Sequence, residues 1–153
     1  MSDRPVRKRP AHGVLLLPNK PTMIFDTVCT KNRSKWLADA EVHDVLKAVW
    51  QQADAWKVGK YVVMPDHIHM FVAHCESDVS YEDWCKYWKS MFTKSFSTKH
   101  GGWQSGHWDT RMRTEDQMEE KWDYIQHNPV RHGLAESPEA WPYRGEIFQF
   151  TWT

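Results

Sequence analysis

The chain has 153 residues, of which 41% are hydrophobic and 26% are charged, and its formal net charge is zero. This composition is typical of a globular protein and the length suits one core, so we expect a single domain over residues 1–153. Zero net charge excludes a protein that binds nucleic acid through its overall charge alone. Three cysteines without a Cys-x-x-Cys pair exclude a zinc ribbon and a disulfide framework, and they fit a reducing compartment.

The sequence shows no apolar run long enough to span a membrane and no signal-peptide core after its first charges. We therefore expect a cytoplasmic protein. Residues 1–20 have the composition of a basic N-terminal arm, with prolines beside clustered positive charges. Ten tryptophans are many for this length, and they either pack in the core or stack on the bases of a nucleic acid.

The body of the chain starts with a strand and a helix. Residues 23–30 are rich in β-branched and apolar side chains, which predicts the first strand. Asp39 then opens a helical pattern, because apolar residues recur at steps of three and four. This apolar stripe consists of Val42, Val45, Leu46, Val49, Trp50 and Trp56.

A hairpin and a second helix follow. Two short apolar runs, 61–64 and 67–73, flank a Pro-Asp turn and predict two paired strands. Ser80 and Asp83 have the spacing of a capping box, which predicts the start of a helix. We expect this helix to end at Gly101–Gly102. Its apolar stripe consists of Trp84, Trp88, Met91, Phe92 and Phe96.

Residues 103–113 predict a fourth strand, and Thr114 with Gln117 predicts the cap of a third helix, which runs to about His127. The order is therefore strand, helix, strand, strand, helix, strand, followed by one extra helix. This is the ferredoxin-like split βαββαβ pattern of an α+β fold, with an antiparallel sheet and an added C-terminal helix. The aromatic-rich tail, residues 138–153, is expected to pack on this body.

His67 and His69 flank one apolar residue in the second strand of the hairpin. Side chains of a strand alternate between its faces, so both imidazoles lie on the same face. The pair is either half of a metal site or two ordinary strand histidines that hydrogen-bond their neighbours. A metal site needs at least one further ligand, and Asp66 and His74 are weaker candidates in the same segment.

Further candidates lie on the third predicted helix. Its apolar stripe contains Trp122, and Tyr124 lies about 200° around the helix from it, so Tyr124 is not an obvious core residue. Asn128 would lie one turn beyond Tyr124 if the helix continued. Pro129 disfavours that continuation, and Asn128 can instead cap a short helix that begins with Pro129. The local sequence leaves both roles of Asn128 open.

Two segments together resemble a known family. Tyr-Val-Val-Met-Pro-Asp-His-Ile-His-Met-Phe-Val, residues 61–72, is similar to the metal-binding strand of the single-tyrosine HUH (IS200-like) transposases. Tyr-Ile-Gln-His-Asn-Pro-Val-Arg-His-Gly-Leu, residues 124–134, is similar to their nucleophile helix. Its Asn-Pro-Val ending most resembles the REP-associated tyrosine transposases, and the resemblance spans roughly residues 22–145.

The resemblance implies a metal-dependent endonuclease and strand transferase that acts on single-stranded DNA, in particular hairpin or REP-type DNA. His67 and His69 would hold a Mg²⁺ or Mn²⁺ ion, and Asn128 would be the third protein ligand. Tyr124 would attack the scissile phosphate and form a 5′-phosphotyrosine, which a later hydroxyl can reverse. Lys121, one turn before Tyr124, would help this attack electrostatically.

The implied partner is single-stranded or hairpin DNA, whose phosphates basic side chains contact. The predicted DNA-binding residues are Arg7, Lys8, Arg9, Lys86, Lys89, Arg111, Arg113 and Arg131. The resemblance also implies a monomer rather than a homodimer, and a location at the nucleoid. Two alternatives remain open: a catalytically silent DNA-binding protein on the same fold, and a metal-dependent hydrolase that uses activated water.

Overall fold

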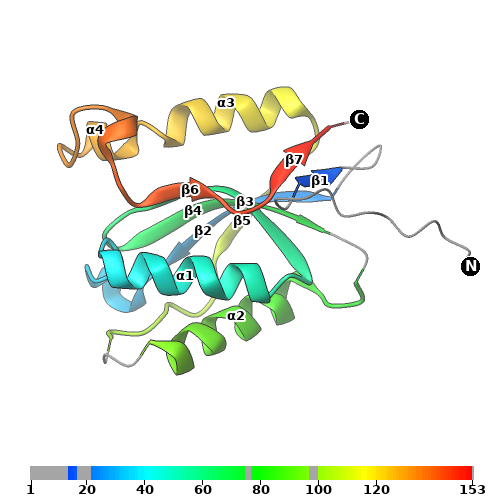
Figure 1. Ribbon diagram of the computed structural model, residues 1–153, viewed down its shortest axis with the longest axis horizontal. Coiled ribbons are helices and arrows are strands. Elements are labelled where there is room, and N and C mark those ends of the chain that lie inside the picture. Colours follow the sequence, from blue (N-terminus) through cyan, green and yellow to red (C-terminus); the bar gives the residue numbers. More distant parts are fainter. Residues whose placement is uncertain (1–13, 17–21, 75–76, 97–99, 153) are drawn as a thin grey trace, which may run out of the picture.

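The computed structural model describes residues 14–16, 22–74, 77–96 and 100–152 (Figure 1). A five-stranded sheet forms the middle layer, with α1 and α2 on one face and α3 and α4 on the other (Figure 1). The predicted DNA contacts Arg7, Lys8 and Arg9 lie outside the described residues, as does most of the predicted N-terminal arm.

The strands of this sheet follow the order β5-β2-β4-β3-β6, and every neighbouring pair is antiparallel. Their bounds are β2 Met23–Cys29, β3 Trp56–Val63, β4 His67–His74, β5 Trp108–Met112 and β6 Arg144–Glu146. The two helices α1 and α2 connect β2 to β3 and β4 to β5, which is the predicted ferredoxin-like arrangement. The predicted α+β class is therefore confirmed.

The α-helices of the described chain are α1 Ala40–Gln52, α2 Tyr81–Ser95, α3 Glu115–Ile125 and α4 Asn128–Arg131. Two short 3₁₀ turns, η1 Lys31–Arg33 and η2 Pro138–Ala140, lie in the connections. Asp39, Ser80 and Thr114 each precede a helix, and their side chains accept hydrogen bonds from backbone N–H groups of its first turn. The first three α-helices therefore begin where their capping residues predict.

Trp56 belongs to a different element from the one predicted. The sequence places it at the end of the first helical stripe, but α1 ends at Gln52 and Trp56 is the first residue of β3. Its buried indole contacts the ring of Tyr81, with 5.0 Å between ring centroids. The spacing from α1 is thus coincidental, and β3 begins five residues before the predicted residue 61.

Two further predicted boundaries between the second helix and the fourth strand are wrong. α2 ends at Ser95, before the expected glycine pair. The strand β5 starts at Trp108 rather than at residue 103. Gly102 and Gly106 have φ angles of 89° and 81°, and these left-handed conformations interrupt an extended chain.

Most tryptophans pack in the core rather than facing solvent. Trp50, Trp84 and Trp88 are almost completely buried between the sheet and the layer of α1 and α2. A second cluster, which includes Phe25 and Ile125, packs α3 on the opposite face. Trp108 is the exception, because 82% of its surface is exposed.

The C-terminal tail packs on the body, as predicted. The indole N–H of Trp141 donates a hydrogen bond of 3.0 Å to the carbonyl of Val63, and β6 pairs with β3. The last strand, β7 Gln149–Thr151, pairs in parallel with β1 Val14–Leu16, a part of the segment that was expected to be an arm. Within the described chain, no helix has the length and apolar character that crossing a membrane requires.

Candidate active site

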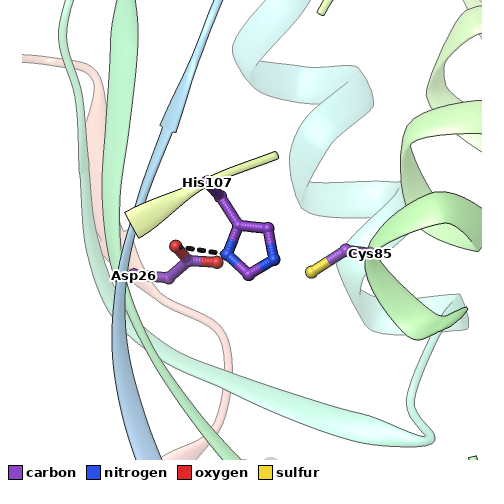
Figure 2. Close-up of side chains that lie close together, drawn as sticks. All are labelled: Asp26, Cys85 and His107. Carbon is purple, nitrogen blue, oxygen red and sulfur yellow. Dashed lines mark hydrogen bonds and ion pairs between the residues drawn. The ribbon is translucent and has the colours of Figure 1, made fainter. Parts of the chain in front are cut away.

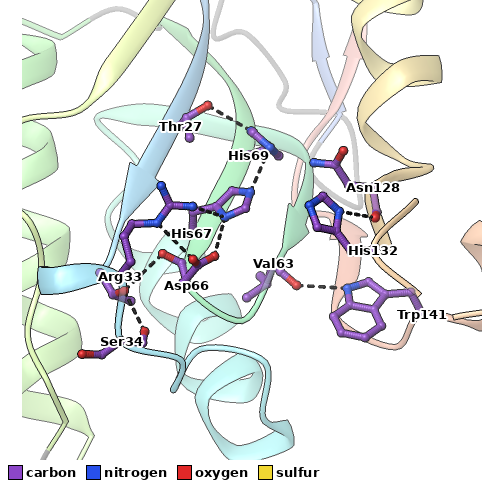
Figure 3. Close-up of polar contacts among 11 residues, drawn as sticks. Thr27, Arg33, Ser34, Val63, Asp66, His67, His69, Asn128, His132 and Trp141 are labelled. Carbon is purple, nitrogen blue, oxygen red and sulfur yellow. Dashed lines mark hydrogen bonds and ion pairs between the residues drawn. The ribbon is translucent and has the colours of Figure 1, made fainter. Parts of the chain in front are cut away.

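Strand β4 presents His67 and His69 on the sheet face that α3 and α4 cover (Figure 3). Their Nε2 atoms lie 3.2 Å apart. Two neighbouring ligands of an octahedral ion at about 2.1 Å lie about 3.0 Å from each other. The spacing of the two nitrogens therefore fits a shared divalent metal ion.

The other ring nitrogens are held by neighbouring side chains. His67 Nδ1 donates a hydrogen bond of 2.7 Å to Asp66, whose second oxygen accepts one of 3.0 Å from Arg33 Nε. His69 Nδ1 lies 3.0 Å from Thr27 Oγ1. Partners on Nδ1 fix the orientation of metal-binding histidines in proteins. Both Nε2 atoms are thereby directed to one point.

The electrostatic surroundings keep both imidazoles neutral. Burial lowers the pKa of His67, and it lowers the pKa of His69 to about 3, with a further contribution from the positive charges around it. Burial alone would raise the pKa of Asp66, but hydrogen bonds from His67 and Arg33 hold it below its usual value. A neutral imidazole is the form that binds a metal, because its free nitrogen keeps a lone pair.

Asn128 approaches this pair from α4, and its amide nitrogen is the side-chain atom on the side of His69 (Figure 3). It is buried, and its Oδ1 accepts a hydrogen bond from the guanidinium of Arg131. The residue before the short helix is His127, and no side chain caps that end. The predicted alternative, a capping role for Asn128, is therefore wrong, because α4 already includes this residue.

Tyr124 is in the last turn of α3, and 63% of its surface is exposed. The guanidinium of Arg131 covers its ring at 3.9 Å from the centroid, and it also donates a hydrogen bond of 2.7 Å to the Tyr124 carbonyl. Because Arg131 also binds Asn128, one side chain links the tyrosine to the predicted third ligand. The expectation that Tyr124 lies outside the apolar stripe is confirmed.

Lys121 connects the same helix to the histidine pair. Its ammonium lies 5.1 Å from the centroid of the Phe25 ring, which stacks on His69 at 5.5 Å. Lys121 and Tyr124 also line a shallow cavity of about 330 Å³ between α3 and β5, together with Thr110. This cavity offers space for a substrate beside Tyr124.

The predicted DNA-binding residues within the described chain lie in three places, one of which is Arg131 on α4. Arg111 and Arg113 are exposed on or next to the edge strand β5. Lys86 and Lys89 belong to α2, which covers the other face of the sheet from α3. The structure therefore does not gather them into one basic surface with Arg131.

A family comparison agrees with this geometry. The profile of the family described as "Transposase IS200 like" matches residues 24–127, which is more than half of the chain. The chain belongs to the IS200-like transposase family. This membership identifies the transposase as an enzyme of the single-tyrosine HUH type that acts on DNA.

The transposase is similar to two curated relatives. A Haemophilus influenzae protein assigned to the REP-associated tyrosine transposases is 25% identical over 155 residues, covering 87% of this chain and 88% of the relative. The REP-associated tyrosine transposase of Escherichia coli K12 is 27% identical over 123 residues, covering 78% of this chain and 73% of the relative.

Solved structures share the fold of the transposase. A REP-associated tyrosine transposase bound to a REP hairpin matches with a TM-score of 0.67 and 24% identity, over 84% of this chain and 78% of that chain. A Deinococcus radiodurans R1 protein assigned as a transposase matches with a TM-score of 0.50 and 21% identity, over 70% of this chain and 90% of that chain.

Two further residues lie at or near the candidate site and were not among the predicted site residues. His132 lies beside Asn128, with its Nδ1 2.9 Å from the Asn128 carbonyl. Figure 3 shows its ring on the side of α4 that faces the histidine pair. Its spacing of four residues from Asn128 was the available signal, since such residues share a helix face.

Trp108 is the second missed residue. Strand pairing aligns Trp108 with Thr27 and Thr27 with His69. Residues in one such row point to the same face of a sheet, and strands are about 4.8 Å apart. The exposed indole therefore lies on the site face, about 10 Å across the sheet from His69.

Proposed function

We propose that this transposase cuts and rejoins single-stranded DNA at REP-type hairpins, through a metal-dependent reaction with a 5′-phosphotyrosine intermediate. The observation that carries the proposal is the convergence of His67 and His69 Nε2 at 3.2 Å, on the face covered by the helix of the exposed Tyr124. The REP hairpin as substrate is supported by the two curated relatives, which are named as REP-associated tyrosine transposases, and by the structurally similar transposase that was solved bound to a REP hairpin.

The residues present fit a divalent ion. His67 and His69 would hold Mg²⁺ or Mn²⁺, which when bound would polarise the scissile phosphate and stabilise charge on its oxygens. Asn128 would be the third ligand once its amide turns Oδ1, which accepts a hydrogen bond from Arg131, towards the ion. Asp66 and Thr27 keep the two rings in the orientation that leaves Nε2 free. In this arrangement the Nδ1 atoms bind side chains that orient the rings, and the Nε2 atoms, which face each other, would bind the ion.

Tyr124 supplies the nucleophile. Its hydroxyl oxygen attacks phosphorus as it loses its proton, a new O–P bond forms, and the bond from phosphorus to the 3′ oxygen breaks. One DNA segment leaves with a free 3′-hydroxyl, and the other stays attached to the protein by its 5′ phosphate. Attack by a 3′-hydroxyl reverses the step and joins DNA, since the phosphodiester energy is retained. Arg131 and Lys121 place positive charge beside the reacting phosphate.

DNA binding needs contacts beyond the reacting phosphate. Arg131 is proposed to bind a backbone phosphate near the site, and the exposed Trp108 to stack on an unpaired base. Arg111 shares a row with Ile24, on the sheet face that α1 and α2 cover, so Arg111 and Arg113 are proposed to contact DNA around the edge of β5. The α2 lysines Lys86 and Lys89 and the N-terminal residues Arg7, Lys8 and Arg9 stay predicted contacts for the rest of the hairpin. We further propose that the transposase works as a monomer in the cytoplasm, at the nucleoid.

The test is formation of a covalent adduct with labelled hairpin DNA that carries single-stranded flanks, in the presence of Mg²⁺ or Mn²⁺. We expect a denaturation-resistant adduct that Tyr124→Phe abolishes. Tyr87→Phe is the matched control, since Tyr87 is also exposed but lies on α2. Cleavage that survives Tyr124→Phe would identify a hydrolase, and binding without cleavage by the wild-type chain would identify a silent DNA-binding protein.

A further inference from the structure

A second set of metal-ligating side chains lies on the opposite face of the sheet from the histidine pair. Asp26 of β2, Cys85 of α2 and His107, just before β5, point towards one another (Figure 2). Their ligand atoms all lie within 4.8 Å of one another. Asp26 and His107 are 81 residues apart, so the fold itself brings these groups together.

The imidazole of His107 is oriented from both sides. Its Nδ1 donates a hydrogen bond of 2.9 Å to Asp26 Oδ1, and its Nε2 lies 2.8 Å from Glu82 Oε1. Glu82 precedes Cys85 by three residues on α2, so the carboxylate and the sulfur leave the helix on the same side. A carboxylate on the second ring nitrogen is the usual partner of a metal-bound histidine.

The cluster is closed towards the core and accessible from one side. The exposed fraction is 0% for Asp26 and 2% for Cys85, whereas the side chain of Glu82 is 65% exposed. Glu82, Cys85 and His107 line a cavity of about 890 Å³ between α2 and the segment before β5. An ion can reach the cluster through this cavity.

We propose that Asp26, Cys85 and His107 bind a divalent cation of the zinc class, with Glu82 holding the second nitrogen of the His107 ring and water in the fourth position. Thiolate, imidazole and carboxylate are the ligands of zinc, whereas Mg²⁺ prefers oxygen alone. Tetrahedral ligands at about 2.0–2.3 Å from an ion lie about 3.3–3.8 Å apart, so side-chain shifts of about 1 Å would form the site.

Binding displaces the proton of the Cys85 thiol, and the ring proton of His107 has to lie on Nε2, facing Glu82, so that Nδ1 can offer its lone pair to the ion. Burial raises the pKa of Cys85 to about 12 and also raises the pKa of Asp26, because charge is unfavourable there without a cation. A divalent ion would compensate both negative charges. It would also tie β2, α2 and the start of β5 together, next to the edge strand that lines the tyrosine cavity.

Cobalt titration of the full, reduced chain tests this site, because a thiolate bound to Co²⁺ absorbs in the near ultraviolet. We expect one equivalent of Co²⁺ to produce this band in the wild type and in a His67→Ala, His69→Ala double variant. Cys85→Ser should abolish the band, whereas Cys29→Ser, the control on the face of the histidine pair, should retain it. The proposal is overturned if the wild type gives no band or if Cys85→Ser keeps it.

A second pair of variants tests the site even if Cys85→Ser disturbs the fold around the buried sulfur. Glu82→Gln should weaken Co²⁺ and Zn²⁺ binding by about 10- to 100-fold, as the loss of an orienting partner does. Asp83→Asn, the neighbouring exposed carboxylate on α2, should bind like the wild type. Equal metal affinities for Glu82→Gln and Asp83→Asn would contradict the assignment. These metal titrations do not measure adduct formation at Tyr124, so their outcome is independent of the proposed DNA cleavage.

Discussion

Asp66 offers the sharpest test of how the proposed metal site is built. Its carboxylate accepts hydrogen bonds from His67 Nδ1 at 2.7 Å and from Arg33 Nε at 3.0 Å. Asp66→Asn keeps the size of the side chain but retains a single acceptor oxygen and no charge. The asparagine can therefore accept a hydrogen bond from His67 or from Arg33, but its one oxygen cannot replace both carboxylate oxygens.

The magnitude follows from this geometry. Removing an orienting partner of a metal-bound histidine typically costs 10- to 100-fold in metal affinity, which is about 1.4–2.7 kcal/mol. We expect Asp66→Asn to weaken Mn²⁺ binding by this factor. Because Tyr124 is untouched, adduct formation should recover when the Mn²⁺ concentration is raised by the same factor.

The assay measures Mn²⁺ binding to the metal-free chain by calorimetry, and adduct yield with hairpin DNA as a function of Mn²⁺ concentration. Asp44→Asn is the control, since Asp44 is an exposed α1 carboxylate in a surface ion pair with Lys47. An unchanged Mn²⁺ affinity in Asp66→Asn would refute the orienting role. A loss of adduct that no Mn²⁺ concentration restores would show that Asp66 acts in another way.

Three further predictions concern DNA binding, pH and the core. Trp108→Ala should weaken binding of a single-stranded flank by about 1–3 kcal/mol in a fluorescence titration, with exposed Tyr87→Ala as the control, and equal losses in both would contradict stacking. Burial lowers the pKa of His43, whose Nε2 lies 2.6 Å from the Tyr61 hydroxyl, so the unfolded chain takes up its proton first. The free energy of unfolding in urea should therefore be highest above about pH 6.5 and fall as the pH drops, with a shallower fall in His43→Gln; identical slopes would contradict this. Leu46→Ala should lower the free energy of unfolding in urea by about 2–5 kcal/mol, because Leu46 is fully buried in the core. A smaller loss would contradict this, because it would mean that neighbouring side chains move into the space that Leu46 leaves.

Local patterns were sufficient for most of the fold. The alternation around His67 and His69, the capping side chains Asp39 and Ser80, and the position of Tyr124 off the apolar stripe all depend on residues a few positions apart. Such short-range relations can be predicted from the sequence, because the periods of strands and helices determine which side chains share a face. The element order, and the two halves of the site, followed from them.

The predicted element boundaries were wrong where the spacing of an apolar residue fits both a helix and a strand. Trp56 continues the spacing of α1 yet lies in β3, and residues 103–107 were predicted as part of a strand although Gly106, with its positive φ, interrupts it. Periodicity cannot separate these cases, since a buried indole satisfies a helix stripe and a strand equally well. Trp56 pairs with His74 of β4, and its indole packs on Tyr81 of α2, so both contacts come from other elements.

The sequence by itself determined the fold class, the shared face of His67 and His69, and the exposed position of Tyr124. Only the tertiary structure decided that Arg131, rather than a helix N-terminus, engages Asn128, and that Trp108 shares a row of the sheet with His69. The same holds for the meeting of Asp26 with His107. These relations join residues on separate elements, or depend on where one element ends, and strand register and helix packing set them through many contacts at once.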